Sequence, residues 1–398
     1  MLPSTTLTPP RGPSRCSRVV TADGGEDLPY LVFLQGGPGH EAGRPTPTNP
    51  PWLARALADF QVVLLDQRGT GRSTPVSSPE IAPLAGLDVR AQAAYLSHLR
   101  ADEIVNDCEL FREFLGAKQW TVLGQSFGGF TTLHYLSTHP ESLAGAIITG
   151  GLSAVRRPID DIYAATWQIM IEKSETYYRR FPGDRGRVRT LSELCAQGAV
   201  TLPNGDVVSP ARFRTIGNNL GLQGGPELLH FLLELDHRSS GFAHDLAQAL
   251  PFAGRNPLYA VLHESSYADG VVTRWSAERT MPDRVRDDVT LLGGEHLHRS
   301  VFAEDTELRP FAEVADLLAE HEWNQLYFPE LLAQADLPVA ASVYYADAFV
   351  PREFSMETAA LLPDCRPWVT SEYEHNGLRA DIAVLDHLIG LLKGRRWL

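Results

Sequence analysis

The sequence predicts an α/β fold, with a mostly parallel sheet covered by helices on both faces and interrupted by a helical insertion. Short apolar runs that are typical of buried strands alternate with helical segments over residues 28–149. Mostly helical periodicity follows from 154 to 336, and apolar runs then return. Buried strands separated by helices are typical of a parallel sheet with both faces covered.

The first part of the sheet follows from the apolar runs in chain order. Residues 1–27 are rich in Pro, Ser and Thr, so we expect them to be poorly ordered or to form one edge strand. Strands are expected where a short apolar run is bounded by turn residues, at 28–34, 60–66, 120–123 and 143–149. Helices are expected where apolar residues recur at a helical period, at 52–59, 90–115 and 130–137.

The sheet resumes after the insertion, so the insertion interrupts a single core. Strands are expected at 337–345 and 366–370, and an amphipathic helix at 378–392 closes the chain. The chain is therefore predicted to divide into a first core segment, a helical cap and a second core segment, at 1–153, 154–336 and 337–398. The ligand site of such a sheet lies beyond the carboxyl ends of its strands.

Composition and charge indicate a soluble globular enzyme. The 398 residues are 43% hydrophobic and 21% charged, and 49 acidic against 35 basic residues give a net charge of -14. This balance argues against binding to nucleic acid or to an anionic membrane. No stretch reaches the ~18 apolar residues of a membrane span, and the N-terminus has no apolar signal core, so we expect a cytoplasmic location. Free thiols are expected at Cys16, Cys108, Cys195 and Cys365.

A serine between two glycines is the predicted nucleophile. Residues 121–129 read Thr-Val-Leu-Gly-Gln-Ser-Phe-Gly-Gly, so an apolar run reaches Ser126 and a helix-compatible segment follows. A serine on a sharp strand-to-helix turn needs small residues two positions away on each side, because larger side chains would clash there. Gly124 and Gly128 occupy these positions. The pattern predicts a nucleophile elbow at Ser126.

A serine nucleophile needs a histidine base that an acid holds in one tautomer. In the α/β-hydrolase order the acid and then the histidine follow the serine. Asp347 follows the first strand after the insertion, and His375 lies between the last strand and the closing helix. Asp336 and Asp364 compete for the role of acid, but capping accounts for them. His387 lies inside the closing helix, where a surface or core role is expected.

The tetrahedral oxyanion of acyl transfer needs two N–H donors. The amide of the residue after the nucleophile supplies one, which is Phe127 here. The other is expected from the Gln-Gly-Gly-Pro-Gly turn at 35–39, where we favour Gly37 and then Gly36.

No metal or cofactor is expected. His263-Glu264 lacks a second histidine four residues on, and His296-Leu-His298 stands without further ligands in reach. The phosphate-binding pattern Gly-x-x-x-x-Gly-Lys is also absent.

Taken together, these motifs resemble the proline iminopeptidases, or prolyl aminopeptidases, of the α/β-hydrolase superfamily, and in particular their longer bacterial branch. The resemblance covers about residues 28–395, with matching motifs at 36–39, 66–73 and 124–129 and further matches at 257–267, 275–279, 344–351 and 374–379. The chain departs from the family at Gln35, where histidine is usual, and at the N-terminus, which is short for the family's first strands.

The resemblance implies a serine aminopeptidase that releases N-terminal proline from peptides through an acyl-enzyme. Such an enzyme recognises a charged secondary amine, and a buried cation needs an anion beside it. The resemblance places Glu264 in that role, with Glu295 as a second candidate. Tyr267 is expected to wall the proline ring, with Phe127 and Trp275 as further aromatic candidates. The oligomeric state is not predicted.

Two other functions stay open from the residues alone. An esterase acting on small neutral esters needs the same triad and oxyanion hole, but gains nothing from a buried glutamate in its acyl pocket. A non-catalytic binding protein with a hydrolase fold is disfavoured because every triad position is filled. A burst of product from an activated ester separates this last function from the two enzymes.

Overall fold

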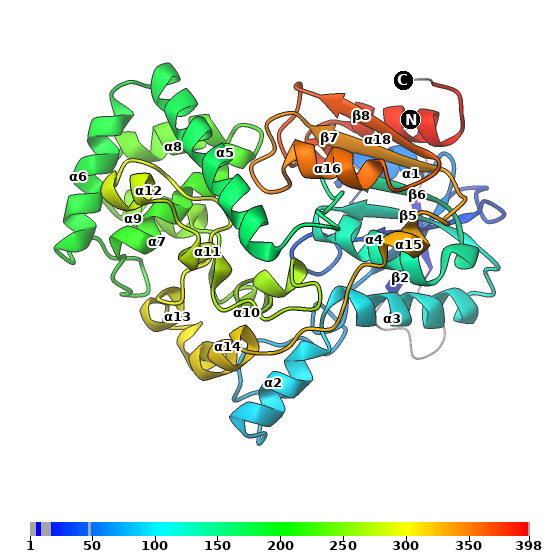
Figure 1. Ribbon diagram of the computed structural model, residues 1–398, viewed down its shortest axis with the longest axis horizontal. Coiled ribbons are helices and arrows are strands. Elements are labelled where there is room, and N and C mark those ends of the chain that lie inside the picture. Colours follow the sequence, from blue (N-terminus) through cyan, green and yellow to red (C-terminus); the bar gives the residue numbers. More distant parts are fainter. Residues whose placement is uncertain (1–4, 9–16, 47–48, 397–398) are drawn as a thin grey trace.

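The computed structural model describes residues 5–8, 17–46 and 49–396 (Figure 1). An eight-stranded sheet with the order β1-β2-β4-β3-β5-β6-β7-β8 lies at its centre. The pairs from β4 to β8 in this order are parallel, and β2 and β1 add antiparallel strands at one edge. The strands are β1 (Thr5–Thr8), β2 (Ser17–Ala22), β3 (Tyr30–Leu34), β4 (Gln61–Leu65), β5 (Trp120–Gln125), β6 (Leu143–Thr149), β7 (Val339–Tyr344) and β8 (Cys365–Thr370).

The predicted α/β sheet is confirmed, with each of the expected strands found within a few residues of its predicted bounds. The N-terminal region differs from the expectation of at most one edge strand. There β2 pairs with β4, with Val19 opposite Val63, and β1 pairs with β2. An open edge of β4 would leave its backbone groups unpaired. The N-terminal residues thus supply the edge strands for which the sequence looked too short.

Helices cover both faces of the sheet because successive strand residues point to opposite sides. Val32 and Val63 belong to the buried cluster that contains residues of α3 and α4, whereas Leu31 and Leu64 belong to the cluster with α1 and α18. The core helices are α1 (Pro51–Ala56), α3 (Ala101–Phe114), α4 (Phe127–Thr138), α16 (Arg352–Ala359), α17 (Gly377–Ala380) and α18 (Ile382–Leu392). The predicted closing helix is therefore two helices, α17 and α18, because Asp381 caps the second by accepting from the Ala383 N–H.

The chain between β6 and β7 is mostly helical, as predicted, and we call residues 154–336 the insertion. Figure 1 shows most of it, in green to yellow, beside the sheet. Its elements are α5 (Ile159–Arg180), α6 (Asp184–Ala196), α7 (Pro210–Arg214), η2 (Thr215–Gly221), α8 (Gly225–Glu234), α9 (Ser240–Ala249), α10 (Pro257–Val261), η3 (Glu264–Ser266), α11 (Ser276–Arg279), α12 (Asp283–Asp287), α13 (Val301–Glu304), η4 (Arg309–Phe311), α14 (Ala312–Ala319) and α15 (Pro329–Leu332). Within the described ranges, no helix is both long and apolar enough for a membrane crossing.

One helix of the first segment packs with the insertion instead of with the sheet. α2 (Val89–Ser97) lies against α14, away from the strands (Figure 1). Leu96 and Leu99 share a buried cluster with Leu258 and Phe311 of the insertion. Residues on the two sides of the predicted boundary at residue 153 therefore pack together, because α2 of the first segment and α14 of the insertion are in contact.

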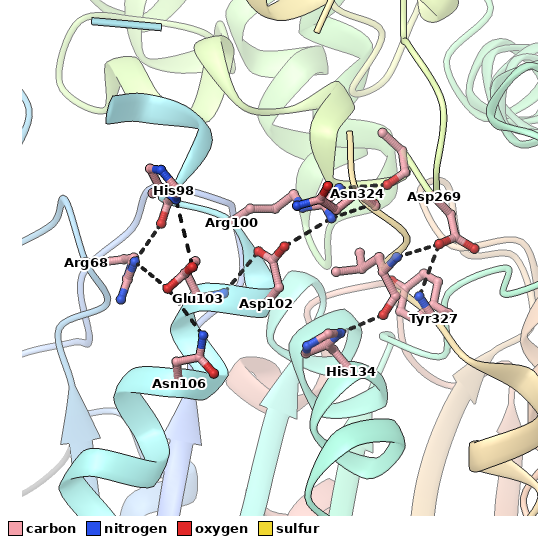
Figure 2. Close-up of polar contacts among 12 residues, drawn as sticks. Arg68, His98, Arg100, Asp102, Glu103, Asn106, His134, Asp269, Asn324 and Tyr327 are labelled. Atoms are coloured by element: carbon pink, nitrogen blue, oxygen red, sulfur yellow. Dashed lines mark hydrogen bonds and ion pairs between the residues drawn. The ribbon is translucent and has the colours of Figure 1, made fainter. Parts of the chain in front are cut away.

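The single helix predicted at 90–115 is wrong, because the structure breaks it at Arg100. α2 ends at Ser97 and α3 begins at Ala101, with extended backbone at Arg100. The Arg100 side chain is only 1% exposed and donates to the carbonyls of Ala268 (2.9 Å) and Asn324 (2.8 Å), as Figure 2 shows in part. A buried guanidinium needs such partners. The break therefore depends on contacts with the insertion, which local periodicity does not reveal.

Three of the four predicted free thiols are observed. Cys108, Cys195 and Cys365 form no disulfide. Cys16 lies outside the described residues.

Candidate active site

Ser126 lies at the turn between β5 and α4 and has the geometry of an elbow. Its φ of 54° and ψ of -121° are unusual for a residue with a side chain. The flanking glycines are sterically required. A Cβ at Gly124 would lie 2.3 Å from the Gly128 carbonyl oxygen, and a Cβ at Gly128 would lie 1.9 Å from that of Leu34. Strained backbone of this kind supports a functional role for the serine it presents.

Asp347 and His375 meet beyond the carboxyl ends of β7 and β8. His375 Nδ1 lies 2.9 Å from Asp347 Oδ2 and 3.0 Å from Oδ1, and both side chains are buried. Asp347 Oδ1 also accepts from the backbone N–H groups of Phe349 (2.9 Å) and Val350 (3.1 Å). These bonds keep the carboxylate facing the ring, so it can hold the imidazole in the tautomer with its proton on Nδ1.

Two successive glycines after β6 lie against His375 and Ser126, one against each residue. A Cβ at Gly150 would lie 3.1 Å from His375 Nδ1, and a Cβ at Gly151 would lie 2.6 Å from the Ser126 carbonyl oxygen. His375 Nε2 is buried and has no hydrogen-bond partner among the described residues. It is therefore free to take a proton, and catalytic hydrogen bonds often shorten only when substrate binds.

The competing residues are engaged elsewhere. The His387 ring stacks on Trp368 with centroids 4.1 Å apart. Asp364 Oδ2 pairs with Arg366 Nη2 at 2.7 Å, and Asp336 is exposed just before β7. The observed geometry therefore favours the triad that chain order predicts.

The pH dependence of activity is expected to follow His375. Burial opposes its positive charge, but the Asp347 carboxylate outweighs burial and raises the pKa of His375 above its ordinary 6.5. A general base must be neutral, so activity is present above this pKa and is lost as the pH falls through it. We expect the acid limb of the kcat/KM profile, measured with an activated ester that does not titrate, to lie above pH 6.5. An acid limb below that pH would contradict the assignment.

The glycine turn after β3 lies against the nucleophile. A Cβ at Gly36 would lie 3.1 Å from Ser126 Cβ. The Gly36 N–H already donates to Gln35 Oε1 (3.2 Å), which favours Gly37, at φ +136°, as the oxyanion donor. Phe127 begins α4, where the first N–H groups have no acceptor within the helix. Gly37 and Phe127 thus remain our two predicted donors.

A small buried cavity borders the proposed base. Phe349 lines it and meets the His375 ring edge-on, with centroids 4.9 Å apart. The Glu295 carboxylate also lines it, accepts a hydrogen bond from the Tyr259 hydroxyl and lies 4.0 Å from His263 Nε2. The other lining residues include Ile162, Tyr163, Thr166, His263, Tyr267 and His296. This cavity has a volume of about 10 Å³, room for one water molecule, and holds one carboxylate among aromatic walls, which must move apart for a proline ring to enter.

Comparison with known proteins identifies the family of this chain. The family model for the alpha/beta hydrolase fold matches residues 29–240. A proline iminopeptidase of Aeromonas sobria is 42% identical over 383 residues, which cover 92% of this chain and 88% of that protein. The chain belongs to the proline iminopeptidase family. A second relative, a proline iminopeptidase of Aspergillus aculeatus, is 30% identical over 390 residues, which cover 93% of this chain and 86% of its own length.

Gln35 is the position where this member of the proline iminopeptidase family departs from the usual histidine. Its side chain holds the glycine turn from two sides, because Nε2 donates to the Glu41 carbonyl (3.1 Å) and Oε1 accepts from Gly36. Oε1 also accepts from Arg379 Nη2 (2.7 Å). The glutamine therefore orders the turn without a titratable group.

The structure separates the two glutamates that the family resemblance suggested. Glu264 is 6% exposed, and its Oε1 accepts from the Ala277 N–H (2.9 Å) at the start of α11. It lines a different small cavity, together with Trp275. Burial raises the pKa of Glu264, which disfavours its charged form. Glu264 and Trp275 therefore lie outside the cavity that Glu295 and Phe349 line, and their roles in binding the amine and the ring stay predictions.

Tyr267 lines the same cavity as Glu295, and its role as a wall for the proline ring stays a prediction. Its ring packs against Phe130 of the elbow helix, with centroids 5.3 Å apart, and against Tyr163 at 5.5 Å. Its hydroxyl donates to the Phe349 carbonyl (3.3 Å). The tyrosine therefore joins the insertion to the core beside the proposed site.

Sequence reasoning missed the histidines of this cavity. His263 and His296 each adjoin a predicted glutamate in the chain, but we weighed them only as metal ligands. The His296 ring stacks on Trp167 with centroids 3.6 Å apart, and burial holds its pKa well below 6.5. Among the described residues there is no cluster of three or more side chains suited to a metal ion. The sequence signal that could have pointed to His263 and His296 is their position in the chain, each next to one of the two glutamates.

Proposed function

We propose that this chain is a serine aminopeptidase that hydrolyses the N-terminal proline from peptides through an acyl-enzyme on Ser126. The observation that carries the proposal is Glu295, a carboxylate in a cavity bordered by the proposed base. A free N-terminal proline carries a positive charge, and such a charge is costly to bury without an anion. Membership of the proline iminopeptidase family supports the same substrate.

The first half of the reaction forms the acyl-enzyme. Ser126 Oγ attacks the carbonyl carbon of the prolyl residue while His375 Nε2 takes the hydroxyl proton. The negative charge that develops on the carbonyl oxygen is stabilised by the N–H groups of Gly37 and Phe127. Asp347 stabilises the imidazolium through Nδ1. His375 then gives the proton to the leaving amine, the C–N bond breaks, and the prolyl group stays on Ser126 as an ester.

The second half releases proline. Water loses a proton to His375 Nε2 and attacks the ester carbonyl, with the oxyanion in the same position. The bond to Ser126 Oγ breaks, and the proton returns from His375 to that oxygen. Proline leaves as the carboxylic acid, which loses its proton to the solvent, and the enzyme is restored with no cofactor in the sequence of steps.

The insertion is proposed to act as the cap that restricts the substrate at its amino side. Tyr163 and Glu295 come from the insertion, whereas Phe349 comes from the core, so the cavity lies where the two meet. A chain continuing beyond the proline nitrogen would have to displace this wall. We therefore retain the predicted organisation, with a core over 1–153 and 337–398 and a cap over 154–336, as part of the proposal.

Glu295→Gln is expected to weaken recognition of the free amine. Hydrogen bonds to charged groups contribute about 1.5–3 kcal/mol, which corresponds to a fall of about 10–150-fold in kcat/KM. The measurement is release of naphthylamine from prolyl-β-naphthylamide. Hydrolysis of a small neutral ester should change by less than about 3-fold, because that substrate has no amine to bind.

Glu264→Gln is the matched control, since Glu264 contacts the Ala277 amide and lines another cavity. It should keep the preference for the prolyl substrate over the ester. If Glu295→Gln lowered both activities equally, the residue would not read the amine, and an esterase would become the better description.

A further inference from the structure

The loop that carries His375 is held by the insertion as well as by the core. The His375 N–H donates to the Gly221 carbonyl (3.1 Å), at the end of η2. The next residue, Asn376, accepts at Oδ1 from the Gln223 N–H (2.8 Å). A Cβ at Gly221 would lie 2.5 Å from the Phe349 ring. Glycine at this position therefore lets the insertion backbone pack against Phe349, whose ring meets that of His375.

The residue before His375 adds an ion pair to the same side. Lys173 Nζ, on α5, lies 2.7 Å from Glu374 Oε2. The two side chains are 10% and 30% exposed, so the pair is more shielded than an ordinary surface pair. Three consecutive residues, 374–376, are thus each bonded to the insertion.

Core contacts hold the imidazole itself. Asp347 orients the ring through Nδ1, and within the loop the Gly377 N–H donates to the Glu374 carbonyl (3.0 Å). The ring is therefore oriented by the core, whereas the His375 backbone N–H and the side chains of Glu374 and Asn376 are bonded to the insertion. A misplacement of about 1 Å in a reacting group can cost 10²-fold in rate.

We propose that the insertion positions the catalytic base, with Lys173 acting through Glu374 to place His375 Nε2 beside the Ser126 hydroxyl. Lys173 is a positioning residue, because its ammonium bonds Glu374 and no member of the proposed triad. The inference rests on the proposed triad, but not on the proposed substrate. It gives the insertion a second role, because the base is in place only when the insertion is docked on the core.

The test uses Lys173→Met in the full-length chain, with prolyl-β-naphthylamide and a small activated ester as substrates. We expect kcat to fall about 10- to 100-fold on both, with KM changed by less than about 2-fold. Arg157→Met is the matched control. It breaks another pair between the insertion and the core, in which Arg157 Nε donates to Glu357 Oε2 (2.9 Å) away from the His375 loop. This control should keep kcat within about 2-fold.

The charge-reversed double variant Lys173→Glu with Glu374→Lys should recover most of the lost kcat, which a loss of general stability would not allow. Glu374→Gln serves if Lys173→Met fails to fold, and should show the same loss of kcat. Unchanged kcat in these variants, or an equal loss in Arg157→Met, would overturn the inference. The ester distinguishes failure of the proposed substrate from failure of the proposed positioning role. A wild-type enzyme that hydrolyses the ester but not the prolyl amide would refute the proposed substrate and leave the positioning role testable. Absence of ester turnover in the wild type would overturn both.

Discussion

Ser126→Ala is expected to lower kcat by about 10⁵- to 10⁶-fold, the scale of loss seen when a serine protease loses its nucleophile. The substitution removes only the hydroxyl, and alanine has the same Cβ as serine, so the strained turn at φ 54° should be retained. Without Oγ no acyl-enzyme forms. The measurements are turnover of an activated ester and of prolyl-β-naphthylamide, with mass spectrometry after a fluorophosphonate probe.

Ser137→Ala is a suitable control on the same helix. The Ser137 hydroxyl donates to the Leu133 carbonyl (2.9 Å), which leaves it no part in the proposed site. The control should keep its activity and should be labelled by the probe at Ser126. Substantial activity in Ser126→Ala, or labelling at another residue, would remove the basis for the proposed mechanism.

Asp347→Asn is expected to lower kcat by about 10⁴-fold, as the equivalent change does in a serine protease of another fold. An asparagine amide can donate to Nδ1 and thereby favour the tautomer that carries its proton on Nε2, where the base must be free. The substitution also removes the carboxylate that raises the pKa of His375, whereas burial, which lowers it, remains. The acid limb of any residual kcat/KM profile should therefore move to lower pH.

Asp364→Asn provides the comparison, because Asp364 pairs with Arg366 outside the site. It should leave both kcat and the acid limb close to those of the wild type. An Asp347→Asn enzyme with its acid limb in the wild-type position would show that another group sets the pKa of the base.

The proposed triad was predictable because each of its signals is local or follows from chain order. The glycines around Ser126 are required by contacts within the elbow and with the adjacent strand. Asp347 and His375 each follow a strand, and the carboxyl ends of parallel strands share one edge of the sheet. The apolar runs in the sequence located those strands and thereby located the two residues that follow them.

The proposed amine-binding residue, Glu295, was not predictable in the same way. His263 and Glu264 are neighbours in the chain, yet they line different cavities, because the short η3 turn sends successive side chains to different sides. Glu295 lies in a segment without regular structure, so no period indicates which way its side chain points. The helix break at Arg100 was also not predictable from local periodicity. The carbonyls that its side chain bonds belong to the insertion, far from Arg100 in the sequence.

If the proposed function is correct, the enzyme binds the charged amine of an N-terminal proline. The most direct test of this binding compares the wild-type kcat/KM for prolyl-β-naphthylamide with that for the N-acetylated compound, which keeps the ring and the leaving group but has no charge. The account predicts turnover of the free amine and a loss of at least about 100-fold on acetylation, since the contact with Glu295 is lost and the acetyl group meets the wall of the insertion. Equal rates on the two substrates would contradict it.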